Sequence, residues 1–574
     1  MRTPSGTSSS PSPPARDAAR LRIALHFARH ASALASHRAS SAGATPIGVY
    51  WPNIRASFDW AAGEGMADGI CDEVWKTLGL GEGLLERADP PTRLRWCDAQ
   101  LSVARRLGDR RLEAEAKIGL GQLGGGLPGG MPYAETLLRE AIEAGEQLAA
   151  LDIVAHALIA RAVLVAEHGI TFTSQDTQIT AELTDQLAAL RERIPARDRI
   201  LATRILLCFA LIRGTQAAYR RQALDAIAQA ETILGEHYDD RLEQQLVITK
   251  LSVLGTGSDL RECREDARQC LSTSQRLGSH VAQASSLTYL AAISLAQGDV
   301  PAAAAYMERV RVLPTRGAHS ARLWDVLALS LDGQLAEAWE ATAEVARSGL
   351  ASGYSELRVT AVIGLQRHVL AFLRGDPDTL RMFVSAARRL LPDDSAAAAL
   401  RAHALAVLGE HAEARAELHR AAARLGEDSL VTGRVHLWAL AETAAELHDR
   451  PLCIRLYGRL RSESGQILTG ALIGMSMGPA ERQLCRIARV LGERDAAVDW
   501  GKRAVDRDVR MGAAPWACLS RIECARAALD RGGDHDRHDA REHLSRALAA
   551  ARTMGMRAAI RTGEALSQRL GQER

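Results

Sequence analysis

Residues 285–313, with the sequence SSLTYLAAISLAQGDVPAAAAYMERVRVL, contain two helical patterns joined by a Gly-Asp pair. Gly298 suits the left-handed backbone that ends a helix, and Asp299 suits the start of the next one. The stretch therefore predicts a helical hairpin, because apolar residues recur at helical spacing on both sides of the pair: Leu287, Leu290, Ala291 and Leu295 before it, and Ala302, Ala305, Tyr306, Val310 and Leu313 after it.

The same arrangement recurs along most of the chain. Helical patterns stop at positions that are 34 to 45 residues apart: Gly169, Gly214, Gly255, Gly298, Gly333, Gly375, Gly409, Asp449, Gly492 and Gly532. A period in this range is typical of stacked helical hairpins. One hairpin cannot bury its own apolar face, so neighbouring hairpins build a continuous core together. The spacing predicts an all-α solenoid of about eleven hairpins between residues 111 and 557.

The composition narrows the class of function. The 574-residue chain has 71 basic and 69 acidic residues. Because these charges nearly cancel, the protein has no overall positive electrostatic field that could hold DNA or an anionic membrane. The nine cysteines include no Cys-x-x-Cys pair and fit a reduced protein. No apolar run reaches the roughly 18–20 residues that a membrane helix needs. We expect a cytoplasmic protein without a direct nucleic-acid or membrane partner.

The sequence predicts a division of the chain into four parts. The Ser/Pro-rich residues 1–16 are typical of a disordered tail. Residues 17–110 are expected to form an irregular helical region, residues 111–560 the superhelix of hairpins, and residues 561–574 a C-terminal tail.

Residues 111–152 resemble a tetratricopeptide repeat, in EAKIGLGQL, in Tyr133-Ala134 and in LLREAIEAGEQLAALD. Two other patches, WPNIRASFDWA (residues 51–61) and residues 489–556, resemble the tetratricopeptide-like C-terminal region of large bacterial signal-transducing ATPases and transcriptional activators, common in actinobacteria. The resemblance implies a right-handed α-solenoid of tetratricopeptide-like helical hairpins.

The chain departs from that family in two modules. Its only Gly-Lys pair, Gly501-Lys502, is followed by Arg503 instead of the Ser or Thr of a nucleotide-binding loop. No basic helix-turn-helix follows the last repeat. The resemblance therefore implies a sensor or scaffold arm without the ATPase and DNA-binding modules.

Residues 116–130, AKIGLGQLGGGLPGG, contain a G-x-G-x-x-G pattern at Gly119, Gly121 and Gly124. A dinucleotide site needs a strand before these glycines and a helix directly after them. Here the preceding residues have a helical period, and a loop separates them from the next amphipathic segment. We interpret Gly119 or Gly121 as a place where two helices cross closely, with no role in binding phosphate.

Two further motifs suggest chemistry. GMSMG (residues 474–478) matches a nucleophile elbow around Ser476, which requires a preceding strand and an α/β sheet; we expect a helical region there, with Gly478-Pro479 at a helix start. DHDRHDAREH (residues 534–543) gathers histidines and aspartates that can bind zinc, but its place between two helices favours a solvated turn. We expect no catalytic residue, no metal and no cofactor, and hence no enzyme.

Three arginines provide the predicted partner-binding site. Arg161, Arg367 and Arg401 each stand eight residues before a turn glycine, on first helices, which usually line the concave face of such arrays. Aligned there, they would grip carboxylates of a peptide or acidic partner; an ordinary solvated face is the alternative.

These observations lead to two hypotheses about function. The first is a non-catalytic protein-interaction scaffold or regulatory sensor arm that binds a peptide, partner domain or small ligand in its concave groove. The alternative is a transcription-regulatory component that acts with a separately encoded ATPase and DNA-binding partner.

Overall fold

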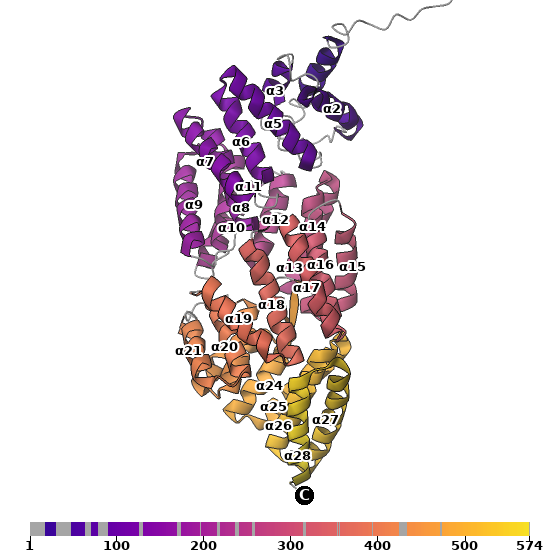
Figure 1. Ribbon diagram of the computed structural model, residues 1–574. Helices are drawn as coiled ribbons and strands as arrows, with labels where there is room; N and C mark the ends of the chain where they lie inside the picture. Colours follow the sequence, from indigo (N-terminus) through magenta and orange to yellow (C-terminus); the bar gives the residue numbers. More distant parts are fainter. Residues whose placement is uncertain are drawn as a thin grey trace, which may run out of the picture. The chain divides into compact units, whose positions relative to one another are not determined.

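The computed structural model shows a helical protein with one short β-hairpin among the residues that it describes (Figure 1). These residues are 18–29, 47–63, 71–78, 90–124, 130–168, 174–195, 197–214, 219–235, 240–254, 259–313, 317–352, 354, 356–392, 394–423, 433–470 and 473–572. The helices of the first half are α2 (Ile47–Ala62), α3 (Asp72–Leu78), α5 (Pro90–Leu107), α6 (Arg110–Gly124), α7 (Met131–Gln147), α8 (Leu151–His168), α9 (Ser174–Arg193), α10 (Arg199–Gly214), α11 (Arg220–Leu234), α12 (Asp240–Leu254), α13 (Leu260–Leu277), α14 (His280–Ala296) and α15 (Val300–Arg311).

The second half contains the hairpin and the remaining helices. They are α16 (Gly317–Leu331), α17 (Leu335–Ala351), α18 (Glu356–Arg374), α19 (Pro377–Leu390), α20 (Ser395–Val407), α21 (His411–Ala423), α22 (Arg434–Glu446), α23 (Arg450–Ser462), β1 (Ile467–Gly470), β2 (Met475–Pro479), α24 (Ala480–Leu491), α25 (Arg494–Met511), α26 (Ala514–Arg531), α27 (Asp534–Met554) and α28 (Arg557–Gln572).

The chain divides into two compact units, which interleave in sequence. One comprises Met1–Val165, Gln186–Cys208 and Thr232–Asp239, and the other comprises Ala166–Asp185, Phe209–Glu231 and Asp240–Arg574. Within the second unit, consecutive helices pack against each other, and neighbouring even-numbered helices from α12 to α16 and from α18 to α28 also contact one another. The even-numbered helices are thus the first helices of successive hairpins. The predicted fold class, an α-solenoid of tetratricopeptide-like hairpins, is confirmed.

The turn chemistry follows the prediction at most positions. Six of the predicted stops have a left-handed φ between +68° and +87°: Gly298, Gly333, Gly375, Gly409, Gly492 and Gly532. Asp299 accepts a hydrogen bond from the Ala302 amide at 3.0 Å and so caps the next helix. Gly169 and Gly255 lie outside the described residues.

The turn between α18 and α19 shows why glycine is required there for two reasons. Gly375 has φ +68°, and a Cβ atom on it would lie 2.6 Å from the backbone nitrogen of Ala558 in α28. Gly409, in the next turn, has φ +81°, but nothing lies within 4 Å of such a Cβ. The first turn is therefore a point of close backbone approach between segments far apart in the sequence.

We expect Gly375→Ala to destabilise the protein by about 3 kcal/mol and Gly409→Ala by about 1 kcal/mol, because both incur left-handed strain but only the first also clashes with a backbone. Urea denaturation of the two variants measures the difference. Equal losses would contradict the close approach of α28 to this turn.

The structure contradicts the helix that we expected around Ser476. Residues of β1 and β2 pair as an antiparallel hairpin, and every residue in both strands is buried. The physical reason is local: Gly465, Gly470, Gly474 and Gly478 are poor helix formers, and the apolar residues between them suit a short buried strand.

The hairpin fills space that a partner was expected to occupy. Its strands contact the first helices α14, α16, α18 and α22, and Gln366 Nε2 on α18 donates a hydrogen bond to the Gly474 carbonyl at 3.0 Å. The face that these four helices present to the hairpin is therefore covered by the chain itself. A partner therefore has no access to that part of the first helices in this structure.

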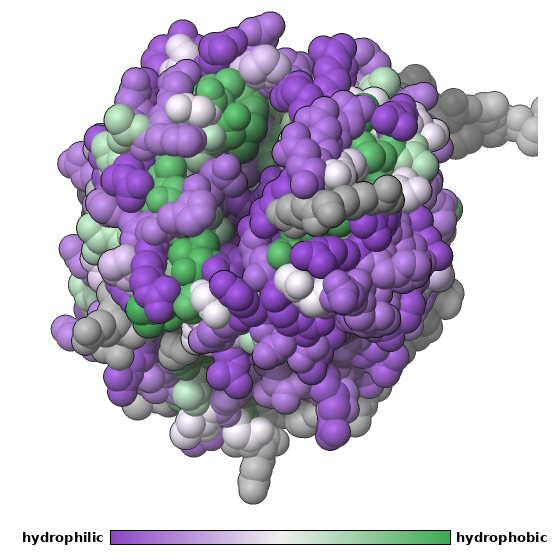
Figure 2. Space-filling model, turned by 90° about the horizontal axis from the view of Figure 1, so that it is seen from below, coloured by the Kyte–Doolittle hydropathy of each residue, from purple (hydrophilic) through white to green (hydrophobic). Residues whose placement is uncertain are grey.

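Two further observations concern the chain ends and the surface. Helix α28 continues to Gln572, past the predicted boundary at residue 560; the rest of the predicted division, including the tail at residues 1–16, lies partly outside the described residues and stays a prediction. None of the described helices is long and apolar enough to cross a membrane. Seen from below, the surface is mostly hydrophilic, with apolar residues gathered along a furrow (Figure 2).

Candidate functional site

The glycine-rich stretch serves helix packing in this structure. Gly119 and Gly121 both lie in α6. A Cβ atom on Gly119 would lie 2.8 Å from Cys97 Sγ of α5, and one on Gly121 would lie 2.6 Å from Leu138 Cγ of α7. The predicted close helix crossing is confirmed at both positions, and a helix precedes the glycines where a dinucleotide site needs a strand.

Two of the three predicted arginines are fully buried. Arg161 Nε donates to Glu135 Oε1 at 2.8 Å, and its Nη1 donates to Gln186 Oε1 at 2.9 Å. Arg401 Nη2 donates to Glu417 Oε2 at 2.9 Å. Each arginine thus connects its own helix to acceptors on neighbouring helices. Their predicted role in binding a partner stays a prediction, and their burial explains why both suit an otherwise apolar helix face.

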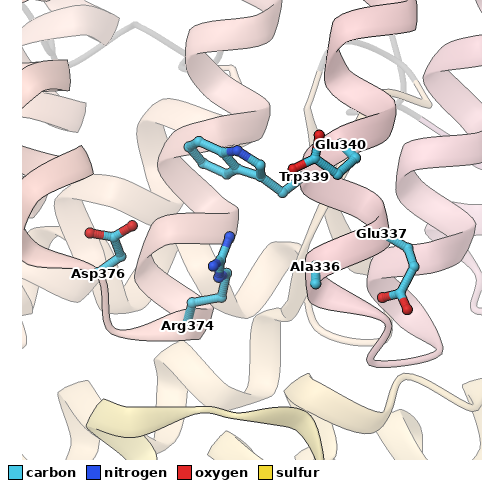
Figure 3. A pocket seen from close by; sticks show the side chains of 6 residues that line it. All are labelled: Ala336, Glu337, Trp339, Glu340, Arg374 and Asp376. Carbon is cyan, nitrogen blue, oxygen red and sulfur yellow. The ribbon is translucent and has the colours of Figure 1, made fainter.

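A groove lies beside the third arginine, Arg367. It has a volume of about 580 Å³ and is lined by α17, the end of α18 and the following turn (Figure 3): Ala336, Glu337, Trp339, Glu340, Arg374 and Asp376. We call it the first groove. Ala336, Glu337 and Glu340 are exposed, so the groove is open to solvent along α17.

Half-buried Trp339 is contacted by two arginines of α18. The guanidinium carbons of Arg367 and Arg374 lie 5.0 Å and 5.5 Å from the centre of a Trp339 ring, within the range of cation–π attraction. Arg367 Nε also donates to Thr342 Oγ1 at 3.0 Å. Figure 3 shows the Arg374 side chain reaching toward the indole. The two arginines therefore hold Trp339 as a fixed aromatic surface.

Three carboxylates and one guanidinium line the first groove, which gives it a formal charge of −2. Glu337 and Glu340 form no hydrogen bond or ion pair with any residue that the structure describes. Burial opposes ionisation of Asp376, but hydrogen bonds from Thr379 hold the pKa of this carboxyl below its usual range. The carboxylates of Glu337 and Glu340, which have no partner among the described residues, suit a basic side chain.

The spacing of the turn glycines predicts only one residue beside this groove. Arg367 follows from its distance to the turn glycine, whereas Trp339 and Arg374 were not predicted. The positions of these two residues relative to the turn glycines are the only sequence signal for them: Trp339 is six residues after Gly333, and Arg374 directly precedes Gly375.

A second cluster of charges is buried where α22, α24 and α26 meet. Glu442 pairs with Arg482 and with Arg486. Glu523 accepts hydrogen bonds from Arg486 at 2.8 Å and from Arg489 at 3.3 Å. The side chains of Glu442 and Glu523 are only 3% and 5% exposed. This cluster, which sequence reasoning also missed, joins three successive first helices.

Two histidines are buried next to these charges. Nε2 of His368 on α18 lies 2.9 Å from Nδ1 of His403 on α20, and Trp438 packs against both rings. Burial lowers the pKa of His368 to about 3. Burial, the neighbouring His368, Arg486 and Arg482 lower the pKa of His403 well below its usual range. Both rings are therefore neutral near pH 7, and one donates to the other inside the core.

The two chemical motifs do not assemble a reactive site in the described part of the chain. Ser476 is buried, and its Oγ accepts a hydrogen bond from the Gly478 amide at 3.3 Å. In α27, Asp536 pairs with Arg531 and Asp539 pairs with Lys502. Among the described residues, no three His, Cys, Asp or Glu side chains are placed to hold a metal ion.

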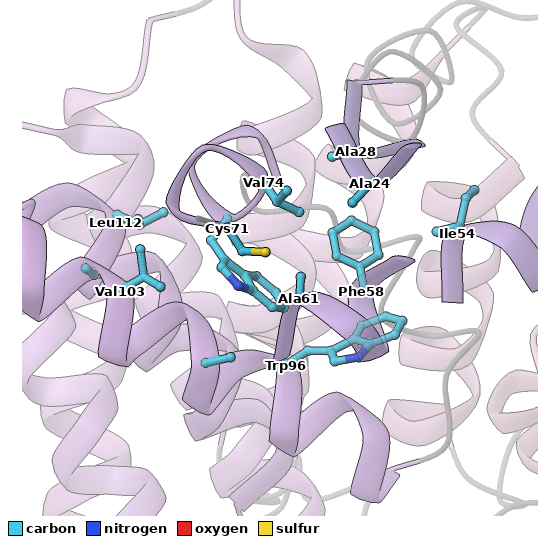
Figure 4. Packing of buried hydrophobic residues seen from close by; sticks show 13 residues of the cluster. Ala24, Ala28, Ile54, Phe58, Ala61, Cys71, Val74, Trp96, Val103 and Leu112 are labelled. Carbon is cyan, nitrogen blue, oxygen red and sulfur yellow. The ribbon is translucent and has the colours of Figure 1, made fainter. Parts of the chain in front are cut away.

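The segment of residues 51–61, one of the patches that carry the resemblance, is part of a packed core. Ile54, Phe58 and Ala61 of α2 are fully buried against residues of α3 and α5, including Trp75 and Trp96 (Figure 4). In this structure the apolar residues of the motif therefore serve internal packing.

Comparisons with known proteins do not assign this chain to a family. No protein-family model matches the chain, and no curated protein matches it. Solved structures with partial likeness include the APC/C hetero-tetramer Cut9-Hcn1 (12% identity, 90% of this chain and 99% of that chain, TM-score 0.42) and Scc4 in complex with Scc2n (10%, 99% and 100%, 0.35). Yeast Tom70 has 12% identity, covering 82% of this chain and 96% of that chain, with a TM-score of 0.28.

Proposed function

We propose that this chain is a non-catalytic protein-interaction scaffold, and that its first groove binds a segment of a partner protein through a basic side chain. The observation that supports this proposal is the open groove itself. In it, Trp339 is held in place beside Glu337 and Glu340, whose carboxylates have no partner among the described residues. Fixed aromatic side chains next to charges are common anchors of protein interfaces.

The shape and charge of the groove argue against other ligands. An enclosed small-molecule site buries most of its ligand, whereas this groove is bordered by exposed residues along α17. Three carboxylates repel the phosphates of a nucleic acid. The β-hairpin covers part of the first helices. A partner segment that lies between consecutive helical hairpins therefore fits the observations better than a ligand bound to the covered face of the first helices.

A single charge reversal tests the proposal. We expect Glu340→Lys to reduce the amount of partner recovered from a lysate of the source cells at least tenfold, because it places a cation where the partner's basic side chain binds. Glu265→Lys on α13 is the matched control, since the Glu265 side chain is 65% exposed and lies outside the groove. Thermal denaturation verifies that both variants fold.

The outcomes separate the alternatives. Recovery of one partner by wild type and by Glu265→Lys, with loss in Glu340→Lys, supports the groove. Equal recovery by all three proteins places the binding surface elsewhere, and recovery of no partner by any of them contradicts the scaffold.

We also propose, on the resemblance alone, that the partner is an ATPase-type regulator in the cytoplasm that acts in transcription. Identification of the recovered protein by mass spectrometry tests this: a nucleotide-binding regulator supports it, and any other class contradicts it. The predicted contribution of Arg161, Arg367 and Arg401 to partner binding stays a proposal. Arg367, which contacts Trp339, is the one placed to affect the first groove.

A further inference from the structure

A second groove lies one hairpin further along the chain. It has a volume of about 470 Å³ and is lined by α19, the end of α20 and the following turn: Arg381, Val384, Ser385, Arg388, Arg389, Leu405, Leu408 and Glu410. We call it the second groove. Each groove lies between the second helix of one hairpin and the end of the first helix of the next, and the two grooves share the α18–α19 hairpin.

The register of the repeat relates part of one groove to part of the other. Counted from the turn glycines Gly333, Gly375 and Gly409, three lining residues of each groove fall at the same offsets. The residue six positions after the glycine lines one wall, and the residues directly before and after the next glycine line the other. The equivalent pairs are Trp339 and Arg381, Arg374 and Leu408, and Asp376 and Glu410.

The two grooves carry opposite charge. Three guanidiniums and one carboxylate give the second groove a formal charge of +2, against −2 for the first. Arg381 pairs with Asp378 and Arg388 pairs with Glu413. Exposed Arg389 forms no hydrogen bond or ion pair with any described residue. A guanidinium in this state is available to bind a carboxylate in bidentate geometry.

We propose that the two grooves form one docking track for a single segment of a partner protein, with its basic half in the first groove and its acidic half in the second. The inference rests on the proposed function and adds the charge pattern and direction of the bound segment. A reversed segment would place like charges together, which is unfavourable. Val384, Leu405 and Leu408 provide apolar contact between the charges of the second groove.

A peptide selection tests the track without knowledge of the native partner. Random 16-residue peptides displayed on phage are selected on the wild-type protein, and enriched peptides are then labelled and titrated by fluorescence anisotropy. We expect enriched sequences to contain one basic and one acidic cluster. Arg389→Glu should weaken their binding at least tenfold, and replacing the acidic cluster of the peptide by lysines should restore binding to this variant within about threefold of the wild-type value.

Arg261→Glu is the matched control, since Arg261 lies on α13 with its side chain 87% exposed, and it should leave binding unchanged. Peptides that are weakened by Glu340→Lys but not by Arg389→Glu would overturn the track while the proposed function stands. Peptides indifferent to Glu340→Lys would contradict the proposed function itself. Enrichment of purely acidic peptides, or of none, would also overturn the track.

Discussion

Replacing Glu523 by glutamine is expected to lower the free energy of unfolding by about 3 kcal/mol, because the change removes a buried carboxylate that Arg486 and Arg489 share. Arg486 then keeps only Glu442 and Glu446, and Arg489 keeps only Asp530. Glu523 is buried and accepts hydrogen bonds from both arginines and from Arg526. Urea denaturation followed by tryptophan fluorescence measures the loss.

Glu446→Gln is the matched control for this prediction. Glu446 pairs with the same Arg486 at 2.9 Å, but its side chain is 48% exposed, so we expect a loss of at most about 1 kcal/mol. Similar losses in the two variants would contradict the buried cluster as a source of stability.

The effect of Glu523→Gln should also depend on pH in a defined direction. Burial alone raises the pKa of the Glu523 carboxyl, but Arg526, Arg486 and Arg489 lower it to about 2, against 4.5 for an ordinary glutamate. The stability from this charge is therefore present above pH 4.5 and is lost as the pH falls toward 2. The difference between wild type and variant should shrink over that interval.

Features of the fold that depend on local rules of helix formation could be predicted from the sequence. Features that depend on contacts between residues distant in sequence could not. Gly298-Asp299 and Gly119 behave as predicted because turn conformation and close helix packing depend on residue types within one or two hairpins. The β-hairpin was missed because strands of four and five residues give almost no periodic signal, and their burial is provided by helices up to about 180 residues away, such as α14.

The candidate site shows the same limit. The distance from a turn glycine identified Arg161, Arg367 and Arg401 together, yet the structure places one beside an open groove and buries the other two. The difference comes from the facing residues. Arg401 donates a hydrogen bond to Glu417 on α21, whereas Arg367 lies over the ring of Trp339 on α17. Such pairings depend on which side chains meet across two helices, which the periodic pattern does not specify.

The buried pair of His368 and His403 predicts that the protein loses stability in mild acid. Both rings are neutral in the folded state because burial lowers the pKa of His368 to about 3 and that of His403 further below its usual range, whereas an unfolded histidine titrates near pH 6.5. The unfolded chain therefore binds more protons, and the stability present above pH 6.5 is lost as the pH falls below it. Each histidine contributes a loss of about 1.4 kcal/mol per pH unit.

We therefore expect the double variant His368→Phe/His403→Phe to lose about 4 kcal/mol less than wild type when the pH is lowered from 7 to 5 in urea denaturation, since both titrating rings are gone. At pH 7 the change should be small, because two hydrogen-bonded partners are replaced together by apolar rings in an aromatic cluster. Phe383→Leu, which loosens the packing on His368 but keeps both histidines, should lower stability equally at both pH values. An unchanged pH dependence in the double variant would mean that the loss in acid comes from other groups, such as His319 and His436, whose pKa values burial lowers to about 4.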